Sequence, residues 1–240
     1  PTGYIDRNPW GPAATMFKTS SGAPYYFNFH QVTTEDRANS AVDPDHKVLA
    51  NTGVIGKSGT GKTVLEMVLL AQLQKFNQPE KGKKLSCVLF DKDLGASIGV
   101  RAMGGTYLPI KNGVPSGFNP FQLDPTPQNI SFLERLVKQL VHHESFPITP
   151  GQEKEIHDAV QGVMGAAKPL RRLGAVLQFL NPTDEFGLHV RLARWCNGGA
   201  LGWLFDNPED TLSIGDDIPI IGFDVTEFLD NPETRTPTIL

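Results

Sequence analysis

Short apolar runs alternate with a helix-length segment in the first half of the chain. The runs cover residues 48–55 and 85–93, and the segment between them, 63–76, is rich in Leu, Met and Val. A short continuous apolar run is typical of a buried parallel strand, and a helix that is apolar almost all round is covered on most sides. The pattern therefore predicts a β-α-β unit within a doubly wound α/β core.

From residue 126 to 200 the pattern changes to helical spacing. Thr126 followed by Pro127 predicts a helix start, and Thr149 with Gln152 has the spacing of a capping box. The first of these helices has apolar residues on one face at Ile130, Leu133, Val137 and Leu140. Two shorter amphipathic pieces follow at 171–180 and 187–196. We therefore expect an all-α insertion at 126–200, flanked by the first part of the core at 1–125 and its return at 201–240.

A last apolar run, 218–224, ends on Asp224, and Glu227 follows closely. Pro219 cannot donate a hydrogen bond to a central ladder, Gly222 weakens a strand, and the residue after Asp224 is Val225 rather than a second acid. The run therefore predicts a strand that is poorly suited to hold a metal. Asp224 and Glu227 are therefore interpreted as a strand end and a helix cap in preference to catalytic residues.

Composition describes an ordinary globular protein. Of 240 residues, 39% are hydrophobic and 20% charged, and the longest apolar run, 67–71, is far shorter than a membrane span. Cys87 and Cys196 lack paired metal-ligand spacing, which favours reduced thiols and a cytoplasmic compartment. The net charge of -4 does not indicate a basic surface that would bind nucleic acid. Pro1 in place of Met and the apolar end at Leu240 indicate a fragment of a longer protein.

The strongest chemical signal is GKSGTGKT at 56–63, which fits the phosphate-loop pattern G-x-x-x-x-G-K-[ST] between a predicted strand and a predicted helix. Glycines let the backbone curve around a phosphate with its N–H groups inward, and the helix dipole favours the anion. The predicted nucleotide-binding residues are Gly56, Lys57, Ser58, Gly59, Thr60, Gly61, Lys62 and Thr63. We expect ATP and Mg²⁺ as cofactors, with Lys62 as the catalytic cation on the β and γ phosphates and the Thr63 hydroxyl on the metal.

Other polar residues carry weaker signals. Asp91 and Asp93 end the second predicted strand, so they should lie near the phosphate loop at the carboxyl edge of the sheet. Either could hold Mg²⁺ through water, or either could cap the helix expected after them; the sequence leaves both open. His142 and His143 are adjacent and point in different directions on a helix, which favours exposed or capping roles over a metal site.

Beyond these motifs the chain resembles a known family. NPWGPA (8–13), YYFNFH (25–30), GKSGTGKT, FDKD (90–93), GFNPFQL (117–123), WLFDNPED (203–210) and GFDVTEFLDNPETRTP (222–237) occur in this order in the large ATPase of type IV secretion systems, of the CagE, TrbE and VirB type. The resemblance implies a RecA-like P-loop ATPase domain with an all-α insertion. It also implies that the acidic strand that holds magnesium and positions water lies beyond Leu240.

The resemblance further implies a ring motor, most simply a hexamer. It would sit at the cytoplasmic face of the bacterial inner membrane, contact the inner-membrane secretion components and energise pilus biogenesis and export. Two alternatives stay open: a related motor that pumps DNA, against which the acidic balance counts, and a nucleotide-stabilised assembly scaffold with incidental turnover. Candidates for an arginine that reaches a neighbouring subunit are Arg171, Arg172, Arg191 and Arg194.

Overall fold

The computed structural model describes residues 13–29, 50–82, 84–212, 220–231 and 234–235. The chain divides into two compact units. Unit 1 comprises residues 1–87 and 95–106, and unit 2 comprises residues 88–94 and 107–240. These boundaries differ from the expected division at 125 and 200, which stays a prediction.

Unit 1 contains an antiparallel hairpin. Strand β1 (Thr15–Lys18) pairs with β2 (Pro24–Phe27), and Met16 lies opposite Tyr26. The turn between them contains Gly22, whose φ of +86° is a left-handed conformation that glycine adopts without a Cβ clash. The Thr19 hydroxyl donates to the Ala23 carbonyl across this turn at 3.0 Å. Local hydrogen bonding therefore closes the hairpin.

Helix α2 (Lys62–Leu73) is the main element of unit 1 and ends in a 3-10 turn, Gln74–Phe76. A second 3-10 turn spans Pro79–Lys81, and helix α3 spans Ser97–Ala102. Helices α2 and α3 approach closely at Gly99, because a Cβ there would lie 2.7 Å from the Met67 sulfur. The expected helix at 63–76 is therefore confirmed, with its α-helical part ending at Leu73.

The strand expected at 48–55 is not present within its described part, residues 50–55. None of these residues is hydrogen-bonded in a ladder with another described residue, and the Ile55 side chain is 100% exposed. A strand needs a partner to satisfy its N–H and C=O groups. The apolar composition predicted a strand, but among the described residues no neighbour pairs with it.

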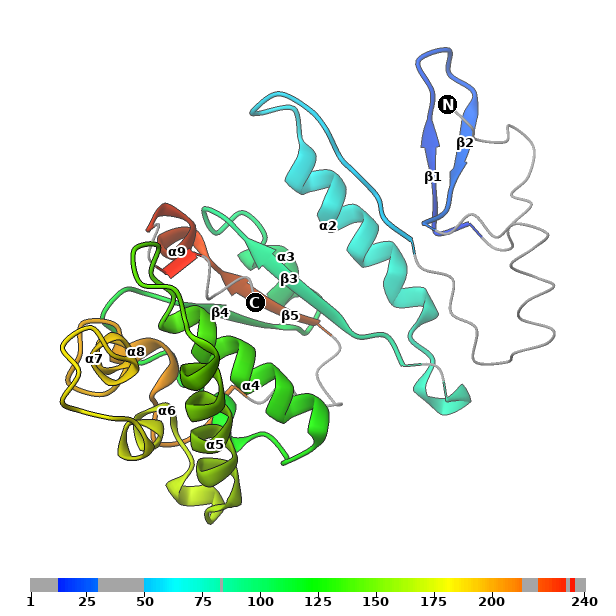
Figure 1. Ribbon diagram of the computed structural model, residues 1–240. Helices are drawn as coiled ribbons and strands as arrows, with labels where there is room; N and C mark the ends of the chain where they lie inside the picture. The colour runs from blue at the N-terminus through cyan, green and yellow to red at the C-terminus, as the bar shows by residue number, and fades with distance from the viewer. Residues whose placement is uncertain (1–12, 30–49, 83, 213–219, 232–233, 236–240) are drawn as a thin grey trace. The chain divides into compact units, whose positions relative to one another are not determined.

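Unit 2 contains a three-stranded sheet in the order β3-β5-β4. The strands are β3 (Cys87–Asp91), β4 (Thr106–Pro109) and β5 (Ile220–Asp224). The Val225 N–H donates to the Asp91 carbonyl at 2.9 Å, and the Ile110 N–H donates to the Asp224 carbonyl at 3.4 Å. All three strands therefore end at the same edge, which makes the sheet parallel and the fold α/β (Figure 1).

The apolar run that ends on Asp224 supplies the central strand of the sheet, and its unsuitability for holding a metal stays a prediction. Strand β5 lies between the other two, and Ile220, Ile221 and Phe223 are all at most 6% exposed. None of the described strand residues, Ile220–Asp224, is a proline, so each of them has a backbone donor. Gly222 is also buried. Burial on both faces outweighs the low intrinsic strand preference of one glycine.

Two long helices of unit 2 begin where the capping signals place them. Helix α4 (Pro127–Leu140) has Thr126 as N-cap, and its side chain accepts from the Asn129 N–H at 3.2 Å. Helix α5 (Pro150–Gly165) has a complete capping box between Thr149 and Gln152. Both predicted starts are confirmed. Figure 1 shows the two helices side by side.

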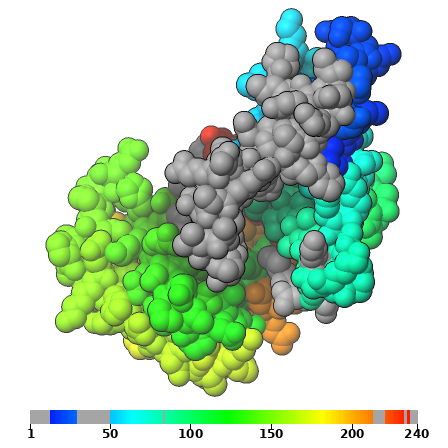
Figure 2. Space-filling model, turned by 90° about the vertical axis from the view of Figure 1, so that its right-hand side faces the viewer, coloured from blue at the N-terminus to red at the C-terminus, as the bar shows by residue number. Residues whose placement is uncertain are grey.

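Shorter helical pieces complete unit 2. They are a 3-10 turn at Pro120–Gln122, a second at Lys168–Leu170, α6 (Leu173–Val176), a third 3-10 turn at Leu177–Phe179, α7 (Leu188–Ala193), α8 (Gly202–Phe205) and α9 (Thr226–Asp230). One hydrophobic core joins α4 to α8 with Ile221 and Phe223 of β5 and with Phe228 of α9. Residues from about 120 to 180 form a continuous surface, green to yellow in Figure 2.

Three buried polar side chains connect segments that are far apart in sequence. The Asn207 amide donates to the Phe118 carbonyl at 2.9 Å, and the Asn119 amide donates to the carbonyls of Arg171 and Asn207 at 2.9 and 2.8 Å. The Asp206 carboxylate accepts from the Gly174 and Asn197 N–H groups at 2.8 and 2.7 Å. These bonds hold residues 117–123, 171–174 and 203–210 together.

Both cysteines are free thiols. Desolvation by burial raises the pKa of Cys196 to about 12, with a smaller effect from Asp206, and burial also raises the pKa of Cys87. Little thiolate therefore forms at neutral pH. Across the described ranges, no helix combines the length and apolar character that a membrane span requires.

We expect Asn207→Ala to lower the free energy of unfolding by about 3 kcal/mol, because it leaves buried carbonyl groups without their donor. Denaturant unfolding of the variant and the native protein measures the difference. Asn181→Ala, at an exposed asparagine of the same unit, is the control and should cost less than about 1 kcal/mol. Equal losses in the two variants would contradict a structural role for the buried network.

Candidate functional site

The phosphate-loop motif forms a turn that leads directly into α2. Gly61 is the N-cap of the helix with a φ of +87°, and Gly59 has a φ of +77°. Any other residue would be strained in these left-handed conformations. The two glycines reverse the chain within a few residues, so the loop stays short and its backbone stays accessible.

The third glycine, Gly56, is needed because the loop leaves no room for a side chain at this position. A Cβ at this position would lie 2.7 Å from the Thr60 hydroxyl oxygen. That hydroxyl donates to the Lys57 carbonyl at 2.7 Å and fixes the loop from within. Gly56 therefore allows the two arms of the loop to approach each other.

Lys62 is folded over the loop. Its ammonium group donates to the Gly56 and Lys57 carbonyls, both at 2.9 Å. An ammonium group has three donors, so one N–H is left for a ligand. The positive charge is therefore held at the mouth of the loop by the loop's own backbone, a contact that the motif alone does not reveal.

Thr63, the second residue of α2, is exposed, as are Lys57, Ser58, Gly59 and Thr60. Helix α2 has no acid in its first turn and no side-chain cap, so no side chain of the helix takes its first N–H groups. Accessible N–H groups at a helix start, together with the helix dipole, favour the binding of an anion. The predicted loop residues lie together in a geometry that fits a nucleotide phosphate, with the Thr63 hydroxyl open to a metal.

The four predicted acids, Asp91, Asp93, Asp224 and Glu227, lie at the carboxyl edge of the sheet in unit 2. Asp91 ends β3 and is 8% exposed, and its carboxylate accepts from the Tyr107 hydroxyl at 2.6 Å. Asp224 ends β5 and accepts from the Thr226 N–H at 3.1 Å. The structure thus brings Asp91 and Asp224 to adjacent strand ends.

The other two acids play different local roles. Asp93 has a φ of +67°, and its N–H donates to the Thr226 hydroxyl at 2.7 Å. Glu227 lies in the first turn of α9 and accepts from the Asn112 N–H at 2.5 Å. Glu227 therefore binds the backbone of a neighbouring loop rather than capping its own helix.

The capping alternative for Asp91 and Asp93 is wrong. Helix α3 has Ala96 as its N-cap, no side-chain cap and no acid in its first turn. The intervening residues, which include Leu94 at a φ of +58°, separate the acids from the helix start. Whether these acids meet the phosphate loop stays a prediction, because the loop and the acids belong to different units.

A cavity of about 270 Å³ opens at this edge of the sheet. Its lining residues are Phe90, Asp91, Lys92, Val225, Phe228, Leu229 and Arg235. Lys92 pairs with Asp230 at 2.7 Å, and this carboxylate raises the pKa of the lysine. The carboxyl edge of a parallel sheet is the usual ligand position in α/β folds. Sequence reasoning missed Tyr107 and Thr226, because their importance comes from contacts across strands.

Three of the four candidate arginines already have partners. The Arg171 side chain donates to the Ala166 carbonyl at 2.7 Å, and Arg191 donates to the Val141 and Phe146 carbonyls at 3.0 and 2.8 Å. Arg194 also has an interaction partner. The Arg172 side chain is exposed and forms no hydrogen bond or ion pair with any described residue.

The expectation that the two histidines are exposed is confirmed, although both lie beyond the end of α4 at Leu140 and not on a helix. His142 and His143 are both exposed, and His143 accepts from the Ser145 N–H at 3.2 Å. Within the described ranges, no three His, Cys, Asp or Glu side chains gather closely enough to hold a metal ion by themselves.

Known proteins with similar sequences match the chain from end to end. PtlC, a type IV secretion system protein of Bordetella pertussis, is 43% identical over 246 residues, which cover 98% of this chain and 29% of PtlC. VirB4 of Brucella abortus is 44% identical over 250 residues, with the same two coverages. VirB4 of Bartonella quintana is 41% identical over 241 residues, covering 100% of this chain and 28% of that protein.

The chain belongs to the VirB4 and PtlC family of type IV secretion proteins. It spans about 29% of the length of these relatives. No protein-family profile matches it. Among solved structures, VirB4 of Thermoanaerobacter pseudethanolicus aligns with a TM-score of 0.66 and 17% identity, covering 95% of this chain and 60% of that one. The structural likeness supports the α/β fold.

Gly61→Ala should weaken nucleotide binding about tenfold, because the left-handed conformation costs a residue with a Cβ roughly 1–2 kcal/mol. Titration with a fluorescent ATP analogue measures the affinity. Gly165→Ala is the matched control, since Gly165 has open space and no positive φ. Unchanged affinity in Gly61→Ala would show that the loop does not need this conformation to bind.

Proposed function

We propose that this chain is the nucleotide-gripping part of an ATP-hydrolysing motor in a type IV secretion system. The observation that carries the proposal is the loop at 56–63, in which two left-handed glycines and a lysine folded over the backbone precede an accessible helix N-terminus. Homology to VirB4 and PtlC supports a place in the secretion system. The proposed architecture is a RecA-like core with an all-α insertion at 126–200.

In this proposal each loop residue has one task. The N–H groups of the loop and of the first turn of α2 bind the phosphates, and the Lys62 ammonium balances the charge that develops on the γ phosphate. The Thr63 hydroxyl would be one ligand of Mg²⁺. When bound, the ion would supply Lewis-acid stabilisation of the phosphoryl group.

The residue that positions the attacking water is assigned less directly. Asp91 and Asp224 are the acids at the strand ends, but each already accepts a hydrogen bond from a neighbour, Tyr107 and Thr226 respectively. A carboxylate has two oxygens, so one accepted hydrogen bond does not by itself exclude either acid as the base. From the family resemblance, the proposal keeps the expectation that the principal acids lie on a strand beyond Leu240, with Asp91 and Asp224 as the alternative.

The proposed setting is a ring of several copies, most simply a hexamer, bound peripherally at the cytoplasmic face of the inner membrane. ATP turnover there would drive conformational work on the inner-membrane secretion components. The net charge of -4 disfavours a DNA-pumping motor. The rate of ATP turnover in the assembled protein distinguishes a motor from a scaffold that uses ATP only to assemble.

Lys62→Ala should lower ATP turnover of the full-length protein by about 100-fold or more, because it removes a cation from the developing charge. Steady-state phosphate release measures the rate. Lys81→Ala, an exposed lysine on the same unit, should stay within about threefold of the native rate. Turnover of Lys62→Ala within threefold of native would contradict the assignment.

Thr63→Ala should weaken nucleotide binding with Mg²⁺ more than without it, since its hydroxyl is the only loop side chain assigned to the metal. Titration calorimetry with Mg²⁺ and with chelator measures the two affinities. Ser58→Ala removes a hydroxyl from the same loop without an assigned metal contact and serves as the comparison. Equal losses in both conditions would reduce Thr63 to a helix-start residue.

A further inference from the structure

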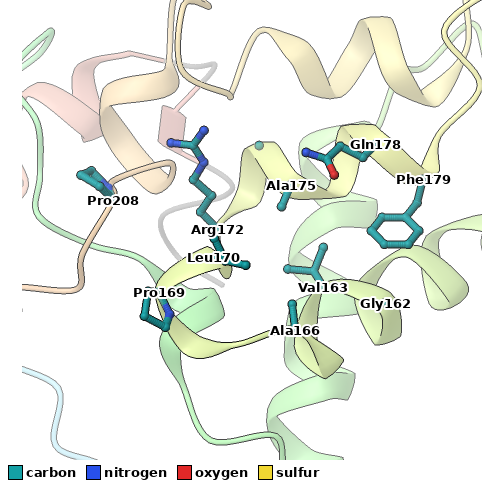
Figure 3. A pocket seen from close by; sticks show the side chains of 11 residues that line it. Gly162, Val163, Ala166, Pro169, Leu170, Arg172, Ala175, Gln178, Phe179 and Pro208 are labelled. Carbon is teal, nitrogen blue, oxygen red and sulfur yellow. The ribbon is translucent and has the colours of Figure 1, made fainter.

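A cavity of about 440 Å³ lies in unit 2 at the C-terminal end of α5. Its apolar walls come from Val163 of α5, from Ala166, the C-cap of this helix, and from Leu170 and Phe179 (Figure 3). Leu170 and Phe179 are 67% and 50% exposed, so the pocket presents apolar surface to water. Pockets of about 300–1,000 Å³ can enclose several ring-sized groups.

One side of this pocket carries an unmatched positive charge. Figure 3 shows Arg172 on the side opposite Phe179. The Arg172 side chain is exposed and forms no hydrogen bond or ion pair with a described residue, although its charge lowers the pKa of Cys196 slightly, and nearby Lys168 interacts electrostatically with Asp210. An apolar pocket with a guanidinium at its rim fits an apolar side chain that has a carboxylate beside it.

Such a group exists on the same unit. Phe146 and Phe186 stack with their ring centroids 4.8 Å apart, and they are 39% and 59% exposed. Three exposed acids are near them in sequence: Glu144, Asp184 and Glu185. We refer to Phe146, Phe186 and these three acids as the acidic aromatic knob. The His143 ring, 5.1 Å from that of Phe146, adds positive charge only when protonated.

The knob and the pocket belong to opposite ends of α5. Phe146 precedes the first residue of the helix, Pro150, whereas Val163 and Ala166 lie at its end. A helix of 16 residues is about 24 Å long. Two complementary patches on separate parts of one molecule join copies head to tail, and such contacts close into rings when the rotation permits.

We propose that the acidic aromatic knob of one copy inserts into the α5 pocket of the next copy, with Glu185 facing Arg172. The inference rests on the proposed assembly of several copies and names one surface through which they meet. Aromatic side chains bury about 150–250 Å² each, so the two phenyl rings can anchor the contact. The ion pair adds specificity and selects the register between copies.

Cysteine cross-linking in the full-length protein tests this contact. We expect Leu170→Cys with Glu185→Cys to form covalent oligomers under mild oxidation, because the proposed contact brings the two positions together in neighbouring copies. Both residues are exposed, and neither belongs to the phosphate loop. Glu185→Cys paired with Asp158→Cys, an exposed residue in the middle of α5, is the control and should cross-link at least about fivefold less.

The native thiols of this chain interfere little, since burial raises the pKa of both. Mass spectrometry identifies the joined peptides. A disulfide that joins position 170 of one copy to position 185 of another supports the proposal. Equal yields in the test and control pairs, or links from these positions only to a different protein, would overturn it.

A charge exchange gives an independent measurement. Arg172→Glu and Glu185→Arg should each raise the concentration needed for assembly about fivefold or more, and the double variant should restore it. Sedimentation measures assembly, while the fluorescent ATP analogue measures binding separately. No shift in either single variant, or no restoration in the double variant, overturns the knob contact. If the native protein did not bind the ATP analogue, the proposed function would be overturned instead. The two failures are therefore distinguishable.

Discussion

The central strand β5 is the constraint on which unit 2 depends. Its neighbours β3 and β4 come from residues before 110, whereas β5 comes from residues 220–224. Two neighbouring parallel strands cannot be joined by a tight turn. The chain must therefore make a long crossover before β5 can form hydrogen bonds with the strands on both of its edges. The helices of residues 127–205 occupy that path and share a core with β5. The sheet and the helical part therefore stabilise each other.

The same strand arrangement organises the acids. Parallel strands bring their carboxyl ends to one edge, so Asp91 and Asp224 become neighbours although 133 positions separate them along the chain. The phosphate loop differs, because its geometry is local. Positive φ angles at Gly59 and Gly61 and the contacts of Lys62 with Gly56 and Lys57 arise within eight residues. A local loop can be identified from its residues alone, whereas the acidic edge needs the fold.

The buried network of Asn119, Asp206 and Asn207 explains two sequence blocks shared with the type IV secretion family. GFNPFQL contributes Asn119, and WLFDNPED contributes Asp206 and Asn207. Their side chains satisfy backbone groups on segments up to 89 positions away, as in the Asn207 contact with the Phe118 carbonyl. Buried polar groups must be paired, so these residues specify how the segments fit together. Their role is structural.

The sequence by itself determined what depends on neighbouring residues. The phosphate loop, the caps at Thr126 and Thr149 and the helices that follow them could all be predicted, because glycine conformations and capping hydrogen bonds act over a few residues. Only the tertiary structure decided the central place of β5, the lack of a strand at 50–55 and the partners of Asp91 and Glu227. Each of these depends on backbone or side-chain groups that are distant in sequence. The intrinsic preference of a residue for helix or strand does not indicate which distant group will contact it in the fold.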